Sequence, residues 1–295
     1  MQRLDWTNRN IDRRKLDLST NVHYDSILNQ EIRNILSEYS TFNNYPYQVD
    51  LYDAISAHYD IPIERLAVGY GATEMLERIF KSLDFDIAYV VEPSFQMMEV
   101  YCHFYNKQYI QISADDLDTL VPLQNSLLAI ANPNGNNGEI HDISSFIDKF
   151  KYVLSDEVYA DFNSYFSLLK YQIPNVLVVK SFSKSLGLAG FRCGFAVSSK
   201  AIIKQLQDIR SNFVMNTFSS IVIPRVIHMT DDVVTRMKHT KRYLETMYEC
   251  KQSNGNYVLF KNVNKYTEVF GSKYIDGFYR MALTDIGVLN DYKSY

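Results

Sequence analysis

The chain has 295 residues, of which 46% are hydrophobic and 22% charged, proportions typical of globular proteins that bury a sizeable core. Its formal net charge of −4 argues against nucleic acid as the main partner. No apolar run approaches the roughly 18 residues that a membrane-spanning helix needs, so we expect no membrane partner.

The cysteines and histidines carry no pattern of their own. Cys102, Cys193 and Cys250 form no CxxC pair, which suits a reducing compartment. The six histidines show no HxxxH or HxH spacing, so we expect no metal site. The polar start of the chain has no apolar segment of the secretory kind. These features predict a cytoplasmic protein.

Strands and helices alternate over most of the chain. In the first half, the apolar pattern predicts helices over 27–39 and 49–59, a strand, glycine turn and helix over 66–80, and strands at 87–91, 109–113 and 127–132. The second half predicts a helix over 143–150, strands at 152–159, 175–179 and 194–198, helices over 200–211, 218–229 and 231–251, and strands at 257–260 and 278–283.

This order predicts an α/β domain followed by a smaller second domain. We expect the large domain to span 43–205 and the small domain to combine 206–295 with 1–42. The N-terminal segment should fold back onto the small domain.

The stretch 178–195 concentrates the groups that bear chemistry. Lys184 follows the strand end and stands between Ser183 and a glycine-rich turn, with Ser181 before it and Arg192 after it. An amine, two hydroxyls and a guanidinium around one anionic site suit a cofactor that has an aldehyde and a phosphate. The amine would form a Schiff base, and the other groups would hold the phosphate.

A further group of anion-binding atoms is predicted where a helix follows the strand that begins at Leu66. Gly71 lets the backbone approach a ligand closely. The amides of Ala72 and Thr73 open the helix, and a helix N-terminus attracts anions.

The string SFSKSLGLAGFRCG, residues 181–194, closely resembles the cofactor-lysine motif of fold-type-I pyridoxal-phosphate (PLP) enzymes. It is most similar to the histidinol-phosphate aminotransferase branch, which also holds threonine-phosphate decarboxylase. The resemblance extends from about residue 16 to about residue 280. It implies the PLP-transferase fold type I, with a mostly parallel central sheet in the large domain, a smaller α+β domain, and PLP as cofactor.

The resemblance also implies roles around the cofactor. Lys184 would be catalytic, and Phe95 would stack on the pyridine ring. Asp156 would keep the ring nitrogen protonated, while Glu157 would face away because strand neighbours alternate. Tyr159 would bond the phenolic oxygen. The phosphate would be held by Gly71, Ala72, Thr73, Ser181, Ser183 and Arg192.

Three further residues match family positions that reach the substrate or the partner subunit. Asn21 and Arg280 would bind the substrate carboxylate, Arg280 through a bidentate pair. Tyr45 would reach the cofactor phosphate of the partner across a homodimer interface. The structural alternatives are a turn asparagine, a solvated strand arginine and a buried loop tyrosine at these positions, and a core phenylalanine at Phe95.

The turn NPNGNNG, residues 132–138, departs from the family pattern NPNNPTG. Gly135 takes the place of the asparagine that normally bonds the phenolic oxygen. A shifted turn would let Asn134 or Asn136 replace it; otherwise that hydrogen bond is missing. The chain is also short for this family, mainly in the C-terminal region.

The leading hypothesis is a PLP-dependent aminotransferase that moves an amino group between an amino acid, or a histidinol-phosphate-like amino-phosphate, and a 2-keto acid. Lys184 would move the α-proton, for which its pKa must fall from about 10.4 through desolvation and the nearby Arg192. The alternatives are a PLP-dependent decarboxylase of a phosphorylated amino acid and a non-catalytic binding protein of the same fold.

Overall fold

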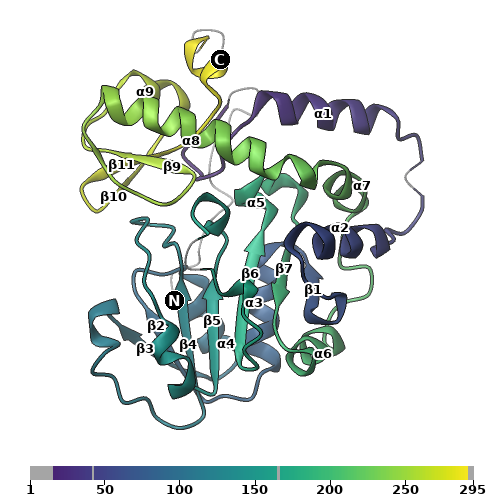
Figure 1. Ribbon diagram of the computed structural model, residues 1–295, viewed down its shortest axis with the longest axis vertical. Coiled ribbons are helices and arrows are strands. Elements are labelled where there is room, and N and C mark those ends of the chain that lie inside the picture. The colour runs from purple at the N-terminus through teal and green to yellow at the C-terminus, as the bar shows by residue number, and fades with distance from the viewer. Residues whose placement is uncertain (1–15, 42, 165–166, 292–295) are drawn as a thin grey trace.

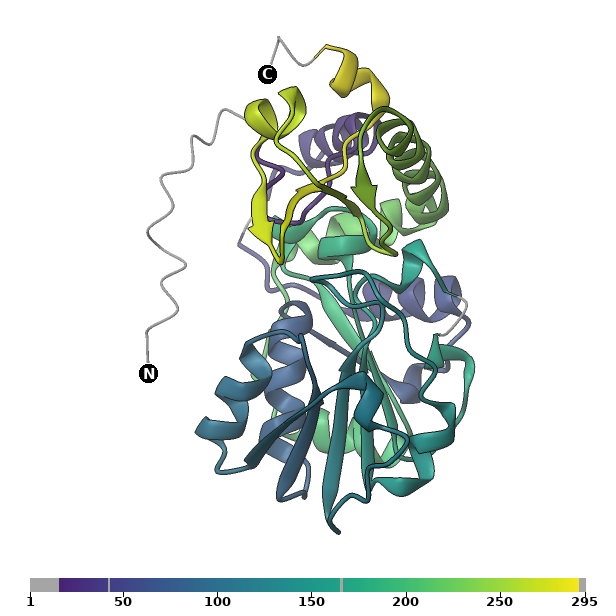
Figure 2. The same ribbon diagram turned by 90° about the vertical axis from the view of Figure 1, so that its left-hand side faces the viewer.

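The computed structural model describes residues 16–41, 43–164 and 167–291. Two β-sheets organise these residues, a seven-stranded sheet and a four-stranded sheet. Figures 1 and 2 show the large sheet at one end of the molecule and the small sheet at the other. Residues 1–15, which belong to the predicted small domain, lie outside the described residues.

The large sheet has the strand order β1-β7-β6-β5-β4-β2-β3. Neighbouring strands from β3 to β6 pair in parallel, and β7 pairs antiparallel with both β6 and β1. The prediction of a mostly parallel central sheet is therefore confirmed. Its strands are β1 (Leu66–Gly69), β2 (Ile87–Val91), β3 (Gln108–Ile112), β4 (Ser126–Ala131), β5 (Tyr152–Asp156), β6 (Val176–Ser181) and β7 (Gly194–Val197).

Helices cover both faces of this sheet, which explains why strands such as β2, β4 and β6 are buried along their whole length. Side chains alternate between faces along a strand, so Ala88 and Val90 join one apolar cluster and Tyr89 joins the other. The first cluster holds residues of α3 (Gly71–Ser82), α4 (Met97–Phe104) and α6 (Lys200–Asp208); the second holds residues of α2 (Val49–Tyr59) and α7 (Thr217–Val226).

The small sheet has the order β10-β11-β9-β8 and is antiparallel. Figure 1 shows α8 and α9 beside it. Its strands are β8 (Cys250–Lys251), β9 (Tyr257–Phe260), β10 (Lys273–Ile275) and β11 (Phe278–Ala282), and the helices of this part are α1 (Ser26–Ser37), α8 (Thr230–Met247), α9 (Lys265–Phe270) and α10 (Ile286–Asn290).

The N-terminal segment packs against this second part of the chain. The Leu18 amide donates to the Phe270 carbonyl at 2.7 Å, and the Leu18 carbonyl accepts from the Ala282 amide at 2.9 Å. Tyr24 forms a parallel bridge with Thr284. The segment therefore connects the small sheet to the start of α1.

Several predicted helices end earlier than expected. The predicted helix over 231–251 ends at Met247, because Tyr248 turns extended and packs edge-on against Phe260 at a centroid distance of 5.5 Å. Cys250 and Lys251 then pair with β9 as β8. The predicted helix over 218–229 is α7 followed by a 3₁₀ turn, and that over 143–150 is also a 3₁₀ segment.

Short 3₁₀ turns connect many of the elements. They are η1 (Ile63–Arg65), η2 (Ala114–Asp116), η3 (Ser144–Lys149), η4 (Ala160–Phe162), η5 (Leu168–Lys170), η6 (Ala189–Phe191) and η7 (Ile227–Met229). Within the described part of the chain, no helix is both long enough and apolar enough to cross a membrane.

Candidate active site

Lys184 lies on α5 (Phe182–Ser185), a single helical turn that directly follows β6. The Ser181 side chain caps this turn by accepting from the Ser183 amide at 3.1 Å, a standard way to satisfy a helix start. The Lys184 amine donates to the Asn21 carbonyl at 2.8 Å and lies 5.5 Å from the centroid of the Tyr159 ring. The end of β6 and the N-terminal segment therefore meet at this amine.

The surroundings of Lys184 disfavour its charged form. Burial lowers the pKa of the amine to about 7, with the positive charge of Arg280 as the next largest cause; the carboxylate of Asp156 opposes this shift and Arg192 adds to it. A lysine with this pKa is partly neutral near pH 7, so it can accept a proton as well as donate one.

Asp156 ends β5 and is buried near the same amine. One of its oxygens accepts a long, 3.4 Å hydrogen bond from the Val158 amide. Burial raises the pKa of this carboxyl to about 7, while the Val158 amide and Lys184 favour its charged form. A cationic group brought next to Asp156 would therefore find a carboxylate that gains by pairing with it.

Glu157 follows the end of β5 and has hydrogen-bond partners of its own. Its carboxylate accepts from the hydroxyls of Ser155 and Ser167 and from the Leu168 amide at 2.7 Å. These partners hold Glu157 in a separate buried network. The two neighbouring carboxylates thus have different surroundings, and of the two it is Asp156 whose charge acts on Lys184.

The start of α3 packs closely against the 181–194 string. Gly71 has a φ of +80°, and a Cβ built on it would lie 2.5 Å from Arg192 Nη2. A Cβ on Gly194 would lie 2.5 Å from the Ala72 amide nitrogen. The two glycines therefore allow a guanidinium to reach the amide-rich N-terminus of α3, an arrangement suited to an anion.

Tyr70 and Ala189 help to fix the Arg192 side chain. The guanidinium carbon lies 5.4 Å from the Tyr70 ring centroid, and Arg192 Nη1 donates to the Ala189 carbonyl at 3.1 Å. Thr73 follows in the first turn of α3, where its carbonyl accepts from the Tyr101 hydroxyl at 3.1 Å. The structure thus brings Arg192 to Gly71, and the strand pair of Ser181 and Gly194 to Ala72.

Tyr159 connects the two predicted substrate residues. Its hydroxyl accepts from Asn21 Nδ2 at 2.6 Å, and its ring lies 2.7 Å from a Cβ built on Gly135. The Gly135 carbonyl in turn accepts from Arg280 Nη1 at 2.7 Å. Arg280 is 9% exposed, so it is a buried arginine rather than a solvated one.

The asparagine-rich turn is held by its own side chains. Asn134 Nδ2 donates to the Pro93 carbonyl, and Asn134 Oδ1 accepts from the Asn136 amide at 2.9 Å. The Tyr257 hydroxyl donates to the Asn134 carbonyl at 3.0 Å. Asn134 therefore braces the turn against the segment before Phe95, which is itself half-buried against the α3 and α4 cluster.

Tyr45 lies apart from these residues within one chain. Its side chain is 68% exposed and stacks on Phe213 with a centroid distance of 4.1 Å and an interplanar angle of 18°. Tyr45 is therefore a surface residue of the single chain, not a buried loop tyrosine.

Two buried residues of the site were not predicted from the sequence. Asn256 Nδ2 donates to the Asn21 carbonyl at 3.3 Å and lies 3.3 Å from His23 Nδ1. Burial, with the charge of Lys184 as the lesser cause, lowers the pKa of His23 to about 3, so His23 is neutral. Asn256 could have been identified from the sequence because it directly precedes the strand predicted at 257–260. Nothing in the sequence distinguishes His23.

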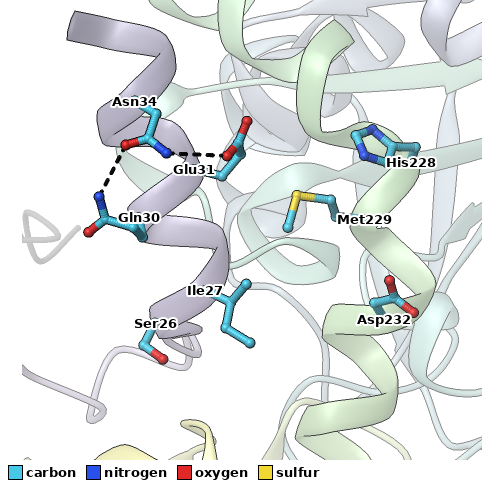
Figure 3. Close-up of a pocket in the computed structure, with 8 residues that line it drawn as sticks. All are labelled: Ser26, Ile27, Gln30, Glu31, Asn34, His228, Met229 and Asp232. Atoms are coloured by element: carbon cyan, nitrogen blue, oxygen red, sulfur yellow. Dashed lines mark hydrogen bonds between the residues drawn. The ribbon is translucent and has the colours of Figure 1, made fainter.

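A separate hollow of about 630 Å³ lies between α1 and the corner where η7 meets α8 (Figure 3). It contains none of the predicted site residues. Its lining residues are Ser26, Ile27, Gln30, Glu31, Asn34, His228, Met229 and Asp232.

A mostly parallel sheet with a lysine directly after β6 and a buried carboxylate at the end of the neighbouring β5 is typical of the fold-type-I class of PLP enzymes. The family model for aminotransferase class I and II matches residues 13–267, so the chain belongs to that family.

The curated relatives reported next are described as histidinol-phosphate aminotransferases. The chain is 29% identical over 241 residues to histidinol-phosphate aminotransferase of Chromohalobacter salexigens, covering 74% of this chain and 68% of the relative. It is 28% identical to histidinol-phosphate aminotransferase of Thermococcus kodakarensis, covering 63% and 59%. The matched part of the chain therefore spans between 59% and 68% of these relatives' lengths.

Solved structures share the fold over nearly the whole chain. Histidinol-phosphate aminotransferase from Sinorhizobium meliloti, in complex with pyridoxal-5'-phosphate, aligns with a TM-score of 0.75 at 15% identity, covering 95% of this chain and 90% of that one. L-threonine-O-3-phosphate decarboxylase from Porphyromonas gingivalis aligns with a TM-score of 0.72 at 15% identity, covering 94% and 97%. At these identities the likeness shows the fold.

The residues of this chain fit PLP, the cofactor of the family. The cofactor's anionic phosphate suits the glycine-lined site that Arg192 enters beside Gly71. Its ring nitrogen, when protonated, suits the buried Asp156 carboxyl, whose charged form lacks solvation. Its aldehyde suits the partly neutral amine of Lys184.

Proposed function

We propose that this chain is a PLP-dependent aminotransferase that moves an amino group between an amino acid or amino-phosphate and a 2-keto acid. The observation that supports this most strongly is that Lys184, just after β6, and the buried Asp156, at the end of the neighbouring β5, lie close enough for the charge of each to act on the other. A lysine that exchanges protons near neutral pH is the feature that a non-catalytic binding protein would not need.

PLP, when bound, supplies a carbonyl carbon for the substrate amine and a ring that withdraws electrons from the substrate Cα. Asp156 would keep the ring nitrogen protonated, and Tyr159 would donate to the phenolic oxygen. Phe95 would cover one ring face and limit access of water. The phosphate would be held by Arg192 with Gly71, Ala72, Thr73, Ser181 and Ser183.

Lys184 would remove the proton from the substrate Cα, hold it, and deliver it to the cofactor carbon that carried the aldehyde. Its lowered pKa makes the neutral amine available near pH 7, and the same pKa makes the protonated amine an effective acid. The Asn21 carbonyl, 2.8 Å from this amine, would orient Lys184 in both forms.

Arg280 would bind the substrate carboxylate. Its Nε is buried and has no hydrogen-bond partner among the described residues, so part of the guanidinium's bonding capacity is unused. The guanidinium carbon lies 5.6 Å from the Tyr257 ring centroid, which would hold the group in place. A substrate carboxylate would accept two parallel hydrogen bonds from the guanidinium, the bidentate geometry that arginine favours.

Exchange of Arg280 for lysine is expected to raise KM for both amino and keto substrates by about 10- to 100-fold, because one charged hydrogen bond of a bidentate pair is lost. Steady-state kinetics with each substrate varied would measure this. Arg225→Lys is the matched control, since Arg225 pairs with Glu38 at the surface at 2.9 Å. An unchanged KM in Arg280→Lys would contradict the assignment.

We also propose a homodimer in which Tyr45 reaches the partner's cofactor phosphate. Tyr45 and Tyr47 are 68% and 82% exposed, and Phe213 beside Tyr45 is 55% exposed. Aromatic side chains left open in one chain suit burial against a second copy. The large domain over 43–205, the small domain formed by the rest, and a cytoplasmic location complete the proposal.

The test of the function is a half-reaction. The purified chain, loaded with PLP, is mixed with one amino donor at a time, including histidinol phosphate and O-phosphothreonine, and its visible absorbance, keto product and CO₂ are measured. Loss of the visible band with an equimolar keto product (a 2-keto acid from an amino acid, a keto-phosphate from histidinol phosphate) and no CO₂ supports amino transfer. Release of CO₂ from an amino-acid donor without a keto product would identify a decarboxylase instead.

A further inference from the structure

We propose that Asn21 is a positioning residue that supplies, through Tyr159, the hydrogen-bond support that Gly135 cannot give to the cofactor's phenolic oxygen. The inference rests on the proposed function, because it assigns a task toward bound PLP. It concerns Asn21 in a role distinct from direct contact with the substrate carboxylate.

The space beside Tyr159 explains why residue 135 is glycine. A Cβ at this position would lie 2.7 Å from Tyr159 Cε2 and 3.2 Å from its hydroxyl oxygen. Contacts under 3 Å require something to move, and the ring of Tyr159 is rigid and buried. The Tyr159 ring therefore occupies the volume that a side chain at residue 135 would need.

Asn134 does not replace the missing side chain. Its amide nitrogen is used by the Pro93 carbonyl and its amide oxygen by the Asn136 amide. Both bonds hold the turn rather than Tyr159. The nearby amide that does reach the Tyr159 hydroxyl comes from the N-terminal segment.

Asn21 is set for this contact by its backbone. Its φ of 60° is in the left-handed region that asparagine tolerates better than most residues. Its carbonyl accepts from Asn256 Nδ2 at 3.3 Å, a bond that does not depend on Lys184, whose free amine donates to the same carbonyl at 2.8 Å. With the backbone held in this way, Asn21 Nδ2 lies 2.6 Å from the Tyr159 hydroxyl oxygen.

The direction of this bond has a chemical consequence. Because the Tyr159 oxygen accepts from Asn21, the hydroxyl proton of Tyr159 remains available to a second acceptor. A hydroxyl that accepts one hydrogen bond is a stronger donor in the next. Asn21 would thereby strengthen donation by Tyr159 to the phenolic oxygen. A phenolic oxygen that accepts this bond would stabilise a proton on the Lys184 nitrogen less, so the pKa of that nitrogen would be lower.

The test uses the PLP-loaded protein without substrate and follows its visible absorbance as a function of pH. Asn21→Gly removes the amide while keeping the left-handed backbone, and is expected to raise the midpoint of the spectral change by about half to one pH unit. Asn21→Ala, which adds backbone strain, is the second variant. Both residue-21 substitutions are also made in a Tyr159→Phe background, where the midpoint should no longer respond to residue 21.

The spectral midpoints decide the matter. A shift that is present with Tyr159 and absent with phenylalanine supports the inference. An unchanged midpoint in both residue-21 variants, or an equal shift in the Tyr159→Phe background, would overturn it. If the wild-type chain shows no visible band with PLP, the proposed function fails instead.

Discussion

Replacement of Lys184 by alanine is expected to lower kcat for amino transfer by at least about 10²- to 10⁴-fold, the range that a positioned acid–base group contributes. The amine is held to the N-terminal segment through the Asn21 carbonyl and lies near the ring of Tyr159. Its pKa of about 7 suits it to proton transfer in both directions. Turnover with a donor identified by the half-reaction would be measured for both proteins.

Lys204→Ala provides a control for the loss of a lysine. Lys204 lies on the exposed side of α6 and pairs with Asp208 at 2.7 Å, so its removal should leave kcat unchanged. Turnover by Lys184→Ala at a rate close to that of wild type would show that the proton is moved by another group.

Replacement of Asp156 by asparagine is expected to lower kcat by about 10²- to 10³-fold, as loss of one preorganised electrostatic contact does. An amide of the same shape cannot stabilise positive charge at the cofactor's ring nitrogen. Glu157→Gln is the matched control, because the Glu157 carboxylate is bound by Ser155 and the Leu168 amide in a separate network. That variant should lose thermal stability while its kcat stays within a few-fold of wild type.

The same Asp156 substitution predicts an effect of pH on the cofactor-free protein. The carboxyl has a pKa of about 7 in the folded chain, above its value of about 3.9 in an unfolded chain. Folding therefore takes up a proton between these values, and the stability that the neutral Asp156 contributes is lost as pH rises from about 4 to about 7. The amide introduced by Asp156→Asn does not titrate.

The melting temperature of Asp156→Asn minus that of wild type should therefore increase from about pH 4 to about pH 7 and level off at higher pH. Thermal unfolding of both cofactor-free proteins across this range measures the difference. A difference that stays constant over the whole range would mean that Asp156 is not the desolvated carboxyl described here.

Local sequence patterns were enough to predict the large sheet and the Lys184 turn. Strands such as β4 and β6 are buried throughout because helices cover both faces, and the apolar runs that result are readable without a structure. The lysine, its capping serine and Arg192 lie within one short stretch. The parts of the site that a single stretch contains were therefore accessible from the sequence.

Contacts between distant segments were not accessible in this way. The bond from Asn21 to Tyr159 and that from Arg280 to Gly135 join residues separated by 138 and 145 positions. Their existence depends on how the N-terminal segment and the small sheet pack against the large one. The burial of His23 and the end of α8 at Met247 depend on the same packing, so no local pattern could predict them.

The most direct test of the central claim is to locate the cofactor on the chain. The PLP-loaded protein is reduced with borohydride, digested, and its peptides are mapped by mass spectrometry. A pyridoxyl-phosphate adduct on Lys184 is the predicted result, and it should be absent from Lys184→Ala. An adduct on another lysine in the wild-type chain, with Lys184 unmodified, would contradict this account of the site.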